Sequence, residues 1–338
     1  MIKNKIKSIL PSSFIVFLRN QKRRRDVMKS YKYDAKRYYR YSATKGFSDE
    51  TKLTGEIIKN YHVVEKGLTM PDSRLGFGQN KVLLLCNDCK MYYSRYNKLE
   101  KQIAHAISVL LEYKKFNEQG NYKLSKEVEN ALNDIEELAR LNRVNKCAQT
   151  SITKENYFKD AHSAFDKFSK SRKSVRNYTS ENIPMEKLSD VVKLALNTPS
   201  ACNRQTSRVY IYDNKKEIAD ILNIQNGSRG FGHLANKLLV ITAELGVFAN
   251  AFERNQAYID GGIFAMNLLY SLHFHEIAAC ILNCSSDYKK DIALRNICKV
   301  KDSEVLIAMI VCGIPPEEFS IALSQRYDAQ EISNIETN

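Results

Sequence analysis

Two short stretches decide how the C-terminal half of this chain is interpreted: Arg172-Lys173-Ser174-Val175-Arg176 and Thr198-Pro199-Ser200-Ala201-Cys202-Asn203-Arg204-Gln205. In an extended segment, the side chains of Arg172, Ser174 and Arg176 point to one side. Arginine guanidinium groups make charge-assisted, often bidentate, hydrogen bonds to phosphate oxygens. The first stretch therefore predicts a phosphate-binding segment, although a basic stretch of this kind standing alone is more often a solvated surface.

The second stretch follows a predicted helix over residues 182–197, which has a proline in its first turn and apolar residues on one face. Small polar residues expose backbone groups and add hydroxyl and amide contacts, which a polar planar ligand needs. A simple helix–strand linker explains Pro199 and Ser200. It does not explain why Asn203 and Gln205 stand directly before a predicted strand.

From about residue 165, predicted helices and strands alternate. The predicted strands cover residues 208–212, 238–242, 277–282 and 305–311, and the predicted helices cover residues 182–197, 215–223, 256–273 and 287–297. The strands are short, β-branched and aromatic or apolar, whereas the helices show apolar residues at helical spacing. Helices packed on a central sheet predict an α/β or α+β domain.

The two stretches, in this order and at this spacing, resemble the nitroreductase family. Three later features resemble that family in the same order: Asp260-Gly261-Gly262 opening a helix over 263–273, Ala279-Cys280-Ile281 in a strand, and Val311-Cys312-Gly313-Ile314-Pro315 in the last strand. The resemblance covers about half of the chain, residues 165–330. It implies an α+β fold, with helices flanking a mixed sheet, joined to a mainly helical N-terminal region.

The resemblance also implies FMN as the cofactor, bound at the interface of an intertwined homodimer. Arg172, Ser174 and Arg176 would hold the phosphate and ribityl chain, and Arg326 would contact the phosphate. The residues that would line the flavin from the partner subunit are Pro199, Ser200, Ala201 and Asn203, with Gln205 as a weaker candidate. Hydride transfer belongs to the flavin, so no catalytic acid or base is assigned to the chain.

The sequence departs from the family at Thr206-Ser207, where Pro-Trp is common, and in the short connection between the strand at Leu238 and the long helix. We therefore expect an oxidoreductase that uses NAD(P)H or another reductant and acts on a specialised small organic substrate. Two alternatives stay open. One is non-reductive flavin chemistry, such as dehydrogenation or flavin breakdown, and the other is a non-catalytic scaffold with a vestigial flavin domain.

Residues 1–45 form a basic, tyrosine-rich arm. They hold fourteen Lys and Arg residues against Asp26 and Asp34, within a net charge of +14 for the whole chain. Basic residues interleaved with aromatic ones can bind RNA or the headgroups of a membrane surface. We favour a solvated helical arm whose tyrosines pack on the body of the protein. The rest of the chain is nearly neutral, which argues against a nucleic-acid-binding domain.

Residues 46–160 are predicted to be mainly helical, because apolar residues recur at helical spacing over 103–111 and 128–138. The stretch 61–78 is polar and contains several glycines. It is therefore predicted to be an ordered loop, either functional or a plain connector.

Other patterns predict no metal site. Cys86-Asn87-Asp88-Cys89 lacks the second pair of ligands that zinc requires, and His273-Phe274-His275 suits the C-terminal end of a helix. The glycine-rich stretch 227–232 follows no buried strand and is predicted to be a mobile loop. The scattered cysteines, a poor match to a signal peptide and the lack of an apolar run of about 20 residues predict a cytoplasmic protein.

Overall fold

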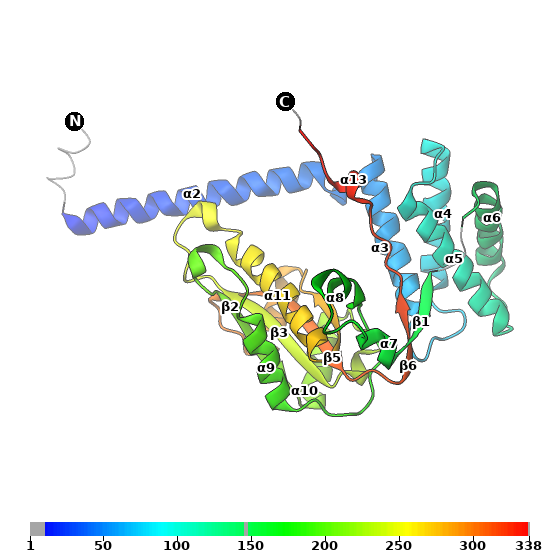
Figure 1. Cartoon of the computed structure of the whole chain (residues 1–338). Helices are drawn as coiled ribbons and strands as arrows, with labels where there is room; N and C mark the ends of the chain where they lie inside the picture. Colours follow the sequence, from blue (N-terminus) through cyan, green and yellow to red (C-terminus); the bar gives the residue numbers. More distant parts are fainter. Residues whose placement is uncertain (1–10, 145–147, 337–338) are drawn as a thin grey trace.

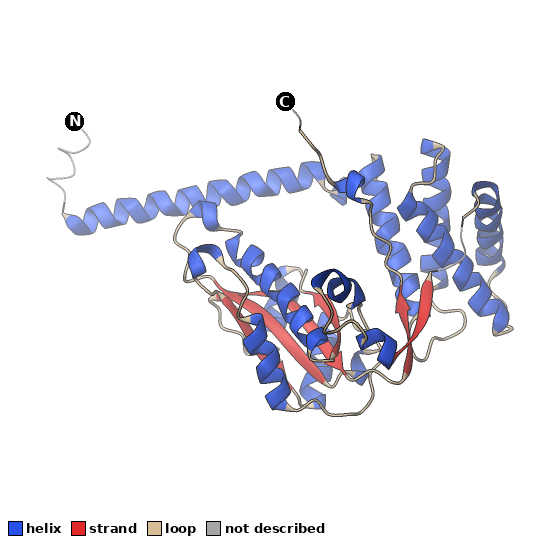
Figure 2. Ribbon diagram, viewed as in Figure 1, coloured by secondary structure: helices blue, strands red, loops and turns tan. Residues whose placement is uncertain are grey.

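The computed structural model describes residues 11–144 and 148–336. The fold has two parts, a helical region and a domain built on a four-stranded sheet, and a long helix extends along one side (Figure 1). Figure 2 shows that strands are confined to the sheet domain and to a small ribbon between the two parts. The predicted α+β class with a mainly helical N-terminal region is confirmed.

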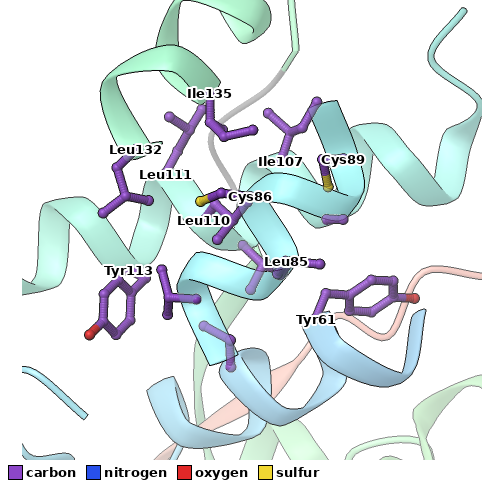
Figure 3. Packing of buried hydrophobic residues seen from close by; sticks show 14 of the residues in the cluster. Tyr61, Leu85, Cys86, Cys89, Ile107, Leu110, Leu111, Tyr113, Leu132 and Ile135 are labelled. Carbon is purple, nitrogen blue, oxygen red and sulfur yellow. The ribbon is translucent and has the colours of Figure 1, made fainter. Parts of the chain in front are cut away.

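The helical region is a bundle of four helices. These are α3 (Glu50–Leu68), α4 (Gln79–Tyr96), α5 (Lys101–Gln119) and α6 (Lys126–Asn142). Each presents a buried apolar face to one common core, which Figure 3 shows from close by. The chain turns between α5 and α6, where Gly120 ends α5 and Asn121 takes a left-handed backbone conformation with φ of 53°.

The predicted loop over residues 61–78 is wrong in its first half. Helix α3 continues to Leu68, and only residues 69–78 are non-helical. Polar residues are tolerated on this helix because Tyr61, Val64 and Leu68 bury one face, while Oε1 of the buried Glu65 accepts hydrogen bonds from other segments.

Cys86 and Cys89 lie in the middle of α4, where they pack in the bundle core (Figure 3). Burial raises the pKa of the Cys86 thiol to about 12 and the pKa of Cys89 well above its ordinary value. Both thiols behave as apolar core side chains.

The sheet of the second part has the strand order β2-β3-β5-β4, with every neighbouring pair antiparallel. The strands are β2 (Ser207–Tyr212), β3 (Lys237–Glu244), β4 (Ala278–Asn283) and β5 (Glu304–Gly313). A parallel bridge between Ser174 and Ala279 adds a short segment at the β4 edge. All four predicted strands are confirmed.

Helices cover both faces of this sheet. Leu239 and Ile241 of β3 pack with α9 (Met185–Ala195) and α11 (Gln256–Phe274), whereas Leu238 and Val240 pack with α10 (Lys215–Gln225) and α12 (Tyr288–Ile297). Alternate residues of a strand face opposite sides of a sheet, so β3 is apolar along nearly its whole length. Helix α11 begins at Gln256, as the predicted helix over residues 256–273 does, so Asp260 lies one turn inside it.

A two-stranded ribbon connects the two parts. Strand β1 (Gln149–Thr153) pairs antiparallel with β6 (Glu318–Ala322), and the sequence pattern predicted neither strand. Two short helices, α7 (Lys154–Phe158) and α8 (Phe165–Ser171), then lead into the sheet domain. The short α13 (Ala329–Ile332) follows β6.

The arm forms the long helix α2 (Ser12–Tyr41), as expected, but its tyrosines do not pack on the body. Tyr38, Tyr39 and Tyr41 are all exposed, and an ion pair of Asp34 with Arg254 joins the helix to the body. None of the helices in residues 11–144 and 148–336 has the length and apolar content needed to cross a bilayer.

Candidate cofactor site

The segment with the two arginines is held in an extended form beside β4. Val175 donates its N–H to the carbonyl of Ala279 at 3.1 Å, and its side chain is fully buried. Because side chains alternate along an extended segment, Ser174 and Arg176 point away from that core and toward a cavity. Tyr178 fixes the far end by donating its hydroxyl to the carbonyl of Val175 at 2.6 Å.

Three predicted residues, Ser174, Arg176 and Arg326, line the same cavity of about 430 Å³. Arg176 is only 6% exposed, and its Nε has no hydrogen-bond partner among the described residues. No carboxylate in residues 11–144 and 148–336 forms an ion pair with it. The cavity therefore contains a buried guanidinium that lacks an anion.

Arg172 lies next to this cavity but does not line it. Its Nε also has no hydrogen-bond partner within the described parts of the chain. The adjacent Ser171 hydroxyl bonds to Nε2 of His273 at 2.7 Å. Burial, with Arg172 and His162 nearby, lowers the pKa of His273 to about 4, so this histidine is neutral and anchors the segment.

Lys66 of α3 adds positive charge near Arg176. Burial lowers the pKa of its ammonium group, and the positive charges of Arg176 and Arg229 lower it further. Its Nζ donates to the carbonyl of Gly227 at 3.0 Å, which ties the glycine-rich stretch to the helical region.

The second predicted group, residues 198–205, lies elsewhere. Pro199, Ser200 and Gln205 line a separate cavity of about 160 Å³, whereas Ala201 and Asn203 belong to a short 3-10 turn beside it. The left-handed φ values of Cys202, Asn203 and Gln205, 54°, 53° and 48°, are unusual for side chains other than glycine.

Helix α11 separates the two groups. The N–H of Ala201 donates to Oδ1 of Asp260 at 3.2 Å near the start of the helix, whereas Ser171 bonds to His273 near its end. The thirteen residue-to-residue steps from Asp260 to His273 span about 20 Å at 1.5 Å per residue. Within one chain the two predicted groups therefore do not form one continuous pocket.

Four polar residues of the large cavity were missed by the sequence analysis as site residues: Tyr61, His62, Glu65 and Gln102 of the helical region. The hydroxyl of Tyr61 donates to Oε1 of Gln102 at 2.7 Å. The polarity of the stretch after Tyr61 was visible in the sequence, but its helical spacing was the signal that would have placed it on α3.

Comparison with known proteins supports the family resemblance for part of the chain. Residues 169–228, which contain both motifs, match the nitroreductase family. This segment is therefore nitroreductase-like, as the two motifs predicted. No match is found among curated proteins.

Solved structures give weaker similarities. An FMN-dependent nitroreductase from Clostridium difficile R20291 is 22% identical, with 51% of this chain and 97% of that chain covered and a TM-score of 0.41. A nitroreductase family protein from Clostridium novyi NT is 18% identical, with 46% and 86% covered and a TM-score of 0.40.

Proposed function

We propose that residues 165–330 bind FMN and act as an FMN-dependent oxidoreductase on a specialised small organic substrate. The observation that carries the proposal is the buried guanidinium of Arg176, which has no anionic partner among the described residues. A buried charge without a counterion costs several kcal/mol. A phosphate group offers an anion with oxygens suited to the guanidinium geometry.

The residues around Arg176 fit a phosphorylated ligand with a polyol chain. Ser174 and Arg326 line the same cavity, and Arg172 lies beside it with an unpaired Nε. We assign these four residues to the phosphate and ribityl chain of FMN, which supplies hydride transfer when bound. The chain itself binds and orients the cofactor.

A homodimer would give residues 198–205 a role at the same cofactor. Helix α11 carries an exposed apolar stripe at helical spacing, formed by Ile259, Ile263, Met266 and Phe274, which are 53%, 45%, 37% and 40% exposed. An apolar stripe of this kind favours burial against another surface. We infer that α11 packs against a second copy, so that Pro199, Ser200, Ala201, Asn203 and Gln205 line the flavin bound by the partner.

The substrate and the reductant belong to the same proposal. The Thr206-Ser207 departure favours a specialised substrate with NAD(P)H or another reductant. Turnover of NAD(P)H with common nitroaromatic or quinone acceptors would support the reductive reaction against dehydrogenation or flavin breakdown. Association of the basic α2 arm with a membrane surface stays a prediction, which liposome co-sedimentation with and without residues 1–45 tests.

The visible absorption spectrum of the purified protein tests cofactor binding. We expect flavin bands, with FMN released on denaturation, in the wild type and in the control Arg140→Ala, which removes a surface arginine paired with Glu137. The double variant Arg172→Ala/Arg176→Ala is expected to be folded and colourless. A folded double variant that retains stoichiometric FMN would contradict the phosphate assignment.

A further inference from the structure

The helical region forms one wall of the cavity that contains Arg176. Tyr61, His62 and Glu65 of α3 and Gln102 of α5 line this cavity opposite the segments of the sheet domain. The cavity is therefore made by both parts of the chain.

Hydrogen bonds fix this wall to the segment that carries Arg326. The N–H of Ser324 donates to Oε1 of Glu65 at 3.1 Å, and Nε2 of Gln102 donates to the carbonyl of Gln325 at 3.2 Å. Arg326 in turn donates from Nη1 to the carbonyl of Ser324 at 2.9 Å. The position of the Arg326 guanidinium is thus coupled to α3 and α5.

Glu65 and His62 form a pair within the wall. Glu65 is fully buried, and its Oε1 also accepts a hydrogen bond from Nε2 of His105 at 2.9 Å. Its Oε2 has no hydrogen-bond partner among the described residues and lies 3.8 Å from Nδ1 of His62. The side chain of His62 is 48% exposed, so it is the accessible member of the pair.

The carboxylate favours one arrangement of the His62 ring. A carboxylate beside Nδ1 favours a proton on that nitrogen and fixes the ring orientation. A phosphate oxygen accepts hydrogen bonds, so the ring that contacts it carries a proton on both nitrogens, with Nδ1–H toward Glu65 and Nε2–H toward the phosphate. In the same cavity Arg176 and Arg326 provide two further cationic groups.

We propose that His62, oriented by Glu65, contacts the phosphate group of FMN together with Arg176 and Arg326. This inference rests on the proposed function, because it assigns an additional ligand-contacting residue to the same cofactor site. His62 is the residue in contact, and Glu65 is a positioning residue that acts through it. The helical region is then a working part of the cofactor site.

Binding of FMN and riboflavin to the flavin-free full-length protein separates the phosphate from the rest of the flavin, since riboflavin lacks only the phosphate. We expect His62→Ala to weaken FMN binding about tenfold, as expected for one lost hydrogen bond to a charged group, and to leave riboflavin binding unchanged. His62→Lys, which keeps a cation, is expected to recover part of the loss. Glu65→Gln is expected to weaken FMN binding without weakening riboflavin binding.

Lys59→Ala is the matched control, because it removes an exposed cation from α3, and Lys59 does not line the cavity. Its affinities for both flavins are expected to equal those of the wild type. The inference is overturned if His62→Ala binds FMN as tightly as the wild type, or if it loses FMN and riboflavin by the same factor. A wild-type protein that binds neither flavin would instead overturn the proposed function and, with it, this inference.

Discussion

Glu65→Gln removes a buried carboxylate whose negative charge the fold stabilises. Burial acts to raise the pKa of Glu65, but hydrogen bonds from His105 and the backbone of Ser324, together with the His62 ring at 3.8 Å, outweigh it and lower the pKa from 4.5 to about 2. These hydrogen bonds join α3 to α5 and to the C-terminal segment, so the substitution acts where these three segments meet.

The sign of the pH dependence follows from this lowered pKa. A carboxyl with a lower pKa in the folded state stabilises the fold above its unfolded pKa, and the contribution is lost as the pH falls toward the folded value. The shift of Glu65 from 4.5 to about 2 corresponds to about 3.4 kcal/mol at neutral pH. At about pH 3.5, about 2 kcal/mol of it remains.

Urea unfolding followed by far-ultraviolet circular dichroism measures this contribution, since the chain has no tryptophan for fluorescence. The difference in unfolding free energy between wild type and Glu65→Gln should shrink by about 1.4 kcal/mol between neutral pH and about pH 3.5. Asp88→Asn is the control in the same bundle. Burial raises the pKa of Asp88, so its ionised form destabilises the fold at neutral pH. The difference in unfolding free energy between wild type and Asp88→Asn should therefore change in the opposite direction on acidification.

A Glu65→Gln difference that stays constant or grows on acidification would refute the reasoning. It would mean that the hydrogen bonds to Glu65 stabilise the protonated carboxyl as well as the carboxylate. The parallel measurement on Asp88→Asn separates this result from a general acid-induced weakening of the bundle.

Two further predictions concern packing and thiol reactivity. A Cβ on Gly313 would lie 2.6 Å from Cβ of Tyr178, so Gly313→Ala should cost about 1–3 kcal/mol of unfolding free energy and weaken FMN binding by displacing the Arg176 segment. Gly55→Ala in α3, whose Cβ meets no atom within 4 Å, should do neither, and equal effects of the two changes would contradict this account. A thiol reagent should modify the exposed Cys202 in the native protein but Cys86 and Cys89 only after unfolding, and rapid native labelling of either buried thiol would be inconsistent with the packing of α4.

Long apolar elements could be predicted from the sequence because the spacing of their apolar residues indicates which face is buried. Helix α5 and strand β3 are examples, since almost every apolar side chain in them contacts a core. Strand β1 could not be predicted, because Gln149–Thr153 is polar and half exposed and is defined by pairing with β6. Such pairing between distant segments leaves no local pattern.

The candidate site likewise contains residues that could be predicted from the sequence and residues that could not. The motif and the family resemblance predicted Ser174, Arg176 and Arg326, and the structure brings these three to one cavity. The role of Glu65 could not be predicted, because its burial depends on His105 and Ser324, which are 40 and 259 residues away. A buried carboxylate is recognisable only once its hydrogen-bond partners are in place.

The walls of the Arg176 cavity come from the beginning, the middle and the end of the chain, at residues 58–65, 174–176 and 324–327. Because synthesis proceeds from the N-terminus, the helical bundle can form while the rest is still being made. The pairing of β1 with β6 has to wait for the last strand. A chain synthesised only as far as β5 therefore lacks the wall that residues 324–327 contribute, so the proposed FMN site becomes complete only after β6 and these residues have been made.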